Sequence, residues 1–135
     1  MNRLLTLASL TLCAAVLGTA HASCAAPKDM NGVWRANDGG TYYVRQLGNQ
    51  VWWVGMSSDS GKSWTNVFHG TRTGNTVKGT WADVPRGQIS SGGSMTLTLS
   101  GVNSVLGFKR TAATGNFGGS TWYMPCDDVI LNPVP

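Results

Sequence analysis

Residues able to carry out acid–base or nucleophilic chemistry are few in this chain and are not grouped. The 135 residues contain six Asp, no Glu, two His and three Cys. His69 has no second His or Cys at the spacing of a metal site. No Ser lies in a nucleophile-elbow context, and no pair of carboxylates lies on a recognisable scaffold for glycoside hydrolysis. We therefore predict no catalytic residues, no metal and no cofactor, and we expect a non-enzyme. A hydrolase built on His69 and an Asp such as Asp83 is the minor alternative.

Aromatic residues are the other group able to bind a ligand, and they are abundant. Six Trp are many for a chain of this length, and an indole is costly to expose without a use. If the strands close into a barrel, their period-two spacing turns one set of side chains inward. Two interpretations stay open for this set, which either fills the core or lines an apolar cup with a shallow ligand site at its open end. The inward set is predicted to bind the ligand and comprises Trp34, Tyr42, Gln46, Trp53, Trp81 and Phe108.

The outward face of the two strands at 41–47 and 50–57 is unusually apolar. By the same parity it carries Tyr43, Arg45, Trp52 and Met56. Contiguous exposed apolar surface usually marks an interface. We expect association of identical copies through this face first, and stacking of a sugar on Trp52 second.

Hydrophobic residues alternate with period two through most of the chain, and Gly, Asn, Asp and Ser interrupt the pattern at short intervals. This pattern predicts an antiparallel meander with no amphipathic helix after the first residues. A two-residue turn at Gly48-Asn49 would pair Val44 with Trp53. Eight strands are predicted, at residues 31–36, 41–47, 50–57, 64–72, 76–83, 94–100, 105–111 and 120–125.

The first 22 residues are typical of a secretory signal peptide. Arg3 precedes an apolar segment too short to span a bilayer, and Ala20-His21-Ala22 forms a small-x-small cleavage site. Lipidation of Cys24 is the rival interpretation, but His21 stands where a lipoprotein signal has a Leu-like residue. Cleavage would leave 23–135 as a single domain, secreted or periplasmic, with no membrane span.

Cleavage would also leave two cysteines, Cys24 and Cys126, at opposite ends of the mature chain. In an oxidising compartment they are predicted to form a disulfide. In a closed meander with an even strand number, the first and last strands are antiparallel neighbours, so the barrel would bring the two cysteines to one rim. We therefore predict an all-β, eight-stranded antiparallel up-and-down barrel closed by an N-to-C-terminal disulfide.

The segment 32–44 resembles the opening strand of the lipocalin and avidin superfamily, the calycin barrels. Gly32-Val33-Trp34 matches the G-x-W motif, and Gly39, Thr41, Tyr42 and Val44 follow at avidin-like spacing. The resemblance covers about thirteen residues and implies the barrel fold. It does not imply biotin binding, because Ala36 and Gly40 stand where the family has the Asn and Ser that bond the ureido oxygen.

The segment 57–64 resembles a single Asp-box, the S-x-D-x-G-x-[ST]-W hairpin of sialidase propellers and other carbohydrate-active proteins. In that motif the Asp binds turn amides, the Gly takes a positive φ, and the Trp packs over the turn. One copy is too few for a propeller. We therefore expect a structural role for the motif rather than a glycan-binding one.

Charge assigns no macromolecular partner. The formal net charge of +4 comes from basic residues that are scattered along the chain, so we predict no nucleic-acid binding. The predicted function is a secreted, non-enzymatic barrel that binds a small-molecule or carbohydrate ligand through aromatic residues. The alternative is a protein-interaction module, such as a secreted inhibitor or adhesin-like subunit, that uses the outer face around Trp52.

Overall fold

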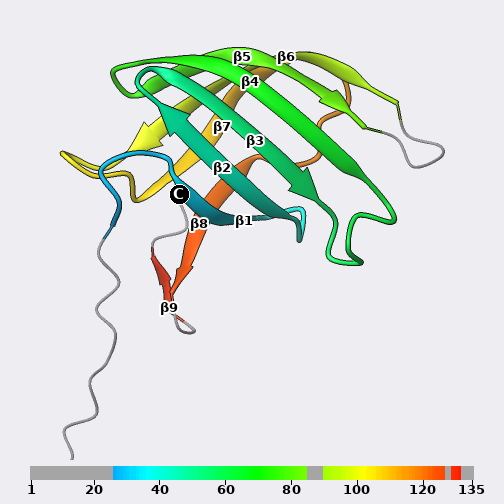
Figure 1. Cartoon of the computed structure of the whole chain (residues 1–135), viewed down its shortest axis with the longest axis horizontal. Coiled ribbons are helices and arrows are strands. Elements are labelled where there is room, and N and C mark those ends of the chain that lie inside the picture. The colour runs from blue at the N-terminus through cyan, green and yellow to red at the C-terminus, as the bar shows by residue number, and fades with distance from the viewer. Residues whose placement is uncertain (1–25, 85–89, 127–128, 132–135) are drawn as a thin grey trace, which may run out of the picture.

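The computed structural model describes residues 26–84, 90–126 and 129–131, which contain nine strands and no helix. The strands follow one another along the chain with short connections (Figure 1). Their bounds are β1 Gly32–Ala36, β2 Thr41–Leu47, β3 Gln50–Met56, β4 Thr65–Thr73, β5 Thr76–Asp83, β6 Gly92–Ser100, β7 Gly107–Ala113, β8 Thr121–Cys126 and β9 Val129–Leu131. Within the described residues, no helix is long and apolar enough to cross a membrane.

Strands β1 to β8 form a closed antiparallel barrel. Each strand pairs with the next, and β1 also pairs with β8 through Arg35 opposite Tyr123 and Ala36 opposite Trp122. Strand β9 pairs antiparallel with the end of β8, outside the barrel (Figure 1). The predicted all-β, eight-stranded up-and-down barrel is therefore confirmed. The predicted Cys24–Cys126 disulfide and the signal peptide at 1–22 involve residues outside the described ranges.

The predicted register of β2 and β3 is confirmed. Val44 lies opposite Trp53 and Tyr42 lies opposite Gly55. Gly48 has φ 58° in the turn between them, a conformation that costs glycine little. Since side chains alternate along each strand, this register fixes which aromatic residues enter the barrel.

Most strand boundaries differ from the predicted ones by one or two residues, and one strand was not predicted. Strand β7 begins at Gly107 rather than at 105, because the backbone N–H of Val105 donates to the Pro27 carbonyl (2.7 Å) outside the sheet. Strand β6 begins two residues early, where Gly92 pairs with Ala82. The short strand β9 was not predicted.

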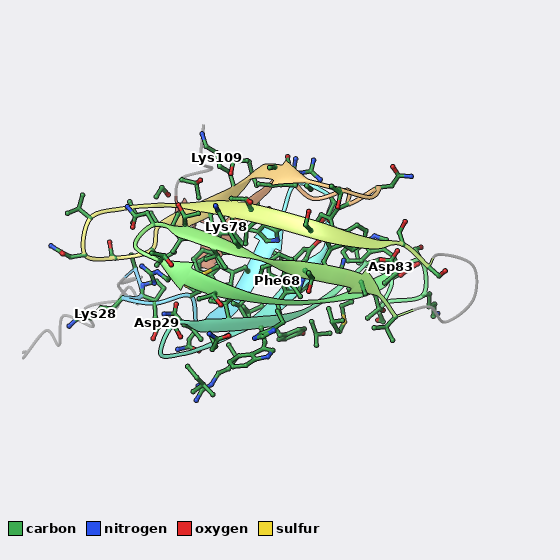
Figure 2. All side chains as sticks on the ribbon, turned by 90° about the horizontal axis from the view of Figure 1, so that it is seen from above. Lys28, Asp29, Phe68, Lys78, Asp83 and Lys109 are labelled. Atoms are coloured by element: carbon green, nitrogen blue, oxygen red, sulfur yellow. The ribbon has the colours of Figure 1, made fainter. Side chains whose placement is uncertain are left out.

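The barrel interior is filled with aromatic side chains. Trp34 and Trp122 have no exposed surface, and Phe108 packs between them with ring centroids 5.0 and 5.1 Å away. Trp53 stacks on Phe68 at 4.3 Å, and Figure 2 shows Phe68 between the two sides of the barrel. These large rings bury much apolar area, and the edge-on and offset contacts add further stabilisation.

The two ends of the barrel differ in their connections. The end that we call the rim carries the β1–β2, β3–β4 and β7–β8 connections and the end of β5 at Asp83. The opposite end carries the N-terminal segment and the tight β2–β3 and β4–β5 turns. Figure 2 shows this separation, with Asp83 at one end and Lys28 and Asp29 at the other.

Candidate functional site

A small hollow opens at the rim, with a volume of about 180 Å³. We call it the rim pocket. Its walls come from strands β4 and β5 and from the connections that follow β1, β3 and β7. It combines aromatic rings with carboxylates and amides. The lining residues are Asp38, Trp64, Asn66, Trp81, Asp83, Asn116, Phe117 and Gly118.

Asp38 is held in place by the turn between β1 and β2. Its carboxylate accepts hydrogen bonds from the Gly40 backbone N–H (2.8 Å) and the Tyr42 hydroxyl (2.6 Å). Burial, and then the neighbouring Asp38 carboxylate, raise the pKa of Tyr42 far above its usual value of 10.0. Tyr42 therefore stays protonated and keeps the carboxylate oriented. A methyl group on Gly119 would lie 2.9 Å from this carboxylate, so glycine is needed there.

Asn66 is a fixed part of the pocket wall. Its side chain is 4% exposed, and its Oδ1 accepts from the Trp53 indole N–H (2.9 Å). Its side chain also forms a hydrogen bond with Tyr42, which lowers the pKa of Tyr42 against the larger effects of burial and of Asp38. A buried amide normally bonds through both ends, and Asn66 does so here.

Two polar side chains of the pocket leave hydrogen-bonding capacity unused. Asp83 accepts only one hydrogen bond among the described residues, from the Ser91 backbone N–H (2.9 Å) to its Oδ2. Asn116 is exposed and its amide makes no hydrogen bond within the described part of the chain. A carboxylate can accept about four hydrogen bonds. The pocket therefore offers both acceptors and donors.

The aromatic walls are fixed by separate connections. Trp64 packs so closely on Gly40 that a methyl group there would lie 2.4 Å from its ring. The indole N–H of Trp81 donates to the Thr114 carbonyl (3.1 Å), and its ring meets Phe117 edge-on at 4.8 Å. The Phe117 carbonyl in turn accepts from the Arg110 guanidinium. Three aromatic residues are thus held at the pocket before any ligand binds.

The β3–β4 hairpin positions Trp64 through Asp59. The Asp59 carboxylate accepts from the backbone N–H groups of Lys62 (2.9 Å) and Ser63 (3.1 Å), and from the hydroxyls of Ser57 and Ser63. The two hydroxyl bonds are the main reason that the pKa of Asp59 lies well below its usual value. Gly61 takes φ 78° in the same turn. This bonded turn sets where β4 begins and where the Trp64 ring lies.

The predicted ligand-binding residues are not brought together at one site. Trp34, Tyr42, Trp53 and Phe108 are buried in the aromatic core, and Trp81 alone of the set lines the rim pocket. Gln46 lies at the opposite end, where its Oε1 accepts from the Met30 backbone N–H (3.2 Å) and from Arg72 (3.1 Å). The other lining residues of the rim pocket were not predicted. Parity would have turned Asn66 and Asp83 inward, but nothing in the sequence indicates that the three rim connections meet them.

The outer face is exposed as predicted from parity. Tyr43, Arg45 and Trp52 are exposed, and Met56 is half-buried. A second hollow, of about 490 Å³, runs over the outside of β2 to β5 and is lined by Tyr43, Arg45 and Trp52 but not by Met56. Trp52 stacks on His69 with ring centroids 5.0 Å apart and planes 18° apart.

His69 and Asp83 do not form a catalytic pair. The His69 Nε2 lies 2.9 Å from the Gln50 Oε1 on the outer face, whereas Asp83 lines the rim pocket inside the barrel end. The structure therefore does not bring His69 and Asp83 together. The described residues also contain no group of three or more His, Cys or Asp side chains arranged for a metal ion.

Comparison with known proteins identifies no relative. No protein-family model, curated protein or solved structure matches this chain. Function is therefore inferred from the chemistry of the rim pocket and the outer face.

Proposed function

We propose that this protein is a non-enzymatic binding protein that holds a carbohydrate ligand, one sugar ring or the end of a glycan, in the rim pocket. One observation carries the proposal: aromatic walls and unused hydrogen-bonding groups meet in a single hollow. At about 30 Å³ per water molecule, the pocket of about 180 Å³ has room for roughly six waters, which is the scale of one sugar ring.

The pocket chemistry matches a hydroxylated ligand better than a purely apolar one. Each sugar hydroxyl both donates and accepts a hydrogen bond. The carboxylates of Asp38 and Asp83 would accept from hydroxyls, while the exposed amide of Asn116 would donate to them. The Trp64 ring supplies an apolar surface for the C–H face of the sugar.

Support for binding without catalysis comes from how the polar groups are engaged. Asp38 is committed to the Tyr42 hydroxyl and the Gly40 N–H, and Tyr42 is held protonated. Asp83, the other carboxylate of the pocket, accepts from the Ser91 backbone N–H, and His69 lies on the outer wall. The pocket groups are therefore placed to hold hydroxyls rather than to transfer protons.

Isothermal titration with a panel of neutral mono- and disaccharides tests the proposal. Asn116→Ala removes an exposed amide that lines the pocket, and losing one or two hydrogen bonds should weaken sugar binding by about threefold to tenfold. Asn75→Ala is the matched control, because Asn75 is also exposed but lies in the β4–β5 turn at the opposite end.

Three results would count against the proposal. Equal loss in the Asn116→Ala and Asn75→Ala variants would place the ligand elsewhere. Binding of tetramethylammonium in preference to every sugar would assign the carboxylates and rings to a cation instead. Release of a cleaved product from a disaccharide would contradict binding without catalysis.

A further inference from the structure

The outer wall of β2 to β5 carries two adjacent cross-strand rows of side chains. We call the first the polar rung, in which Arg45 pairs with Trp52, Trp52 with His69, and His69 with Thr80. The second, the apolar rung, is the next row on the same face. It lies two residues away on each strand, about 7 Å from the polar rung. It consists of Tyr43, Val54, Val67 and Ala82.

These two rungs line the groove of about 490 Å³, which is distinct from the rim pocket. The side chains of the apolar rung remain open to solvent, with Tyr43 51% and Val54 41% exposed. The Trp52 ring stands beside them and is fixed by its stack on His69, whose Nε2 is paired with Gln50. The groove is therefore a preformed apolar surface of the size of ordinary small-molecule sites.

Charge on the outer wall has one sign. Arg35, Arg45, Lys78 and Lys109 lie on outward positions of β1, β2, β5 and β7. The four Asp of the described residues all lie at the ends of the barrel, and Figure 2 shows Lys78 and Lys109 on the wall with Asp29 and Asp83 at opposite ends. An apolar groove with Arg45 at its edge, and with no carboxylate of the described residues nearby, attracts an anionic ligand.

The same distribution of charge argues against a second copy as the occupant. A two-fold interface through this wall would bring the same basic residues of both copies together, with no wall carboxylate to pair with them. A ligand with an apolar body and an anionic end satisfies both rungs. We propose that this groove binds a free single-chain anionic amphiphile, with its apolar chain over Val54 and Val67 and its anionic head at Arg45. This site is independent of the proposed sugar site.

Isothermal titration of the full mature chain with three twelve-carbon probes, each below its micellar concentration, tests the proposal. The probes are dodecanoate, the neutral octaethylene glycol dodecyl ether, and dodecyltrimethylammonium. We expect the affinity to fall in that order, because the chain is shared and only the head differs. Arg45→Gln should weaken dodecanoate binding by about threefold to fivefold, the range of a solvent-exposed charge pair, and should leave the neutral probe unchanged.

Two matched variants separate the groove from general surface effects. Lys109→Gln removes the same charge from the wall outside the groove and should change dodecanoate binding less than about twofold. Val54→Thr keeps the β-branched shape but adds a hydroxyl to the apolar rung, and it should weaken all three probes. Val102→Thr, in the exposed β6–β7 connection, should weaken none. Thermal unfolding of each variant checks that the barrel is intact.

Four outcomes would overturn the proposal. The first is equal affinity for the three probes, and the second is an equal loss of dodecanoate affinity in Arg45→Gln and Lys109→Gln. The third is a concentration-dependent dimer that Arg45→Gln strengthens. The fourth is binding to anionic phospholipid vesicles without binding to free dodecanoate. The third would assign the wall to a second copy, and the fourth would assign it to a membrane surface.

Discussion

Two fully buried indoles in the core differ in one hydrogen bond, and this difference predicts their response to the same substitution. The Trp34 Nε1 donates to the Met30 carbonyl (2.9 Å). The Trp122 Nε1 is buried and has no hydrogen-bond partner among the described residues. Both side chains have 0% exposure. Replacing either by Phe removes a similar volume, so the cavity costs should be similar.

The hydrogen-bond terms have opposite signs. Trp34→Phe leaves the Met30 carbonyl without its donor, which costs about 1–3 kcal/mol. Trp122→Phe removes an N–H group that is already unsatisfied, and so it removes a penalty of similar size. We therefore expect Trp34→Phe to lower the free energy of unfolding by roughly 2–6 kcal/mol more than Trp122→Phe does.

Urea denaturation followed by circular dichroism measures both variants on one scale, provided that the slopes of the transitions agree. A difference below about 0.5 kcal/mol, or a larger loss in Trp122→Phe, would refute the assignment of these two donors. Trp34→Phe should also loosen the N-terminal segment, because Met30 is buried against the core. Faster amide exchange at residues 29–31 in that variant alone would support this reasoning.

Three further predictions concern the rim. Gly119→Ala places a methyl group 2.9 Å from the Asp38 carboxylate and should destabilise the barrel by about 1–3 kcal/mol. Gly118→Ala is the control, because its methyl group would meet nothing nearer than 4.0 Å and should leave the stability almost unchanged. Thermal unfolding of both variants measures the difference. Asp59 has a folded-state pKa below its usual 3.8, so its bonds stabilise the fold above that pH and this contribution is lost as the pH falls through the lower, folded-state value. Asp59→Asn should flatten that acid-side decline in urea titrations between pH 2 and 5, and an unchanged decline would contradict the assignment. The Arg110 guanidinium holds the Phe117 carbonyl, so Arg110→Met should weaken sugar binding at the rim pocket in titration calorimetry while Lys109→Met does not.

Much of the fold follows from local patterns in the sequence. Period-two alternation and the Gly48-Asn49 turn were enough to pair Val44 with Trp53 and to turn Trp34 inward. The alternation of β6 continues through Met95, Leu97 and Leu99, but its register with β7 shifts between Thr96 and Leu97 and leaves Thr111 as an extra residue on β7. A pattern read along one strand contains no information about its neighbour's bulge, and this limits prediction of β7.

The candidate sites were predicted unequally for a related reason. Exposure of Tyr43 and Trp52 depends only on parity within two adjacent strands, and it was predicted. The rim pocket depends on Asp38, Asn66 and Asn116, which come from three distant parts of the chain. Such convergence is decided by barrel closure and loop geometry, since loop residues have no periodicity to read. Composition likewise indicated a large aromatic core, but it left open whether the inward side chains fill the barrel or line a cup.

The central claim, sugar binding at the rim, is tested most directly by the indole N–H signals of the six Trp in a two-dimensional ¹H–¹⁵N spectrum during titration with the tightest saccharide. Trp64 and Trp81 line the rim pocket, Trp34 lies in the closed core, and Trp52 lies on the outer wall. We predict that the Trp64 and Trp81 signals shift together with one dissociation constant while those of Trp34 and Trp52 stay in place. Shifts confined to Trp52, or no shift at saturating sugar, would contradict the claim.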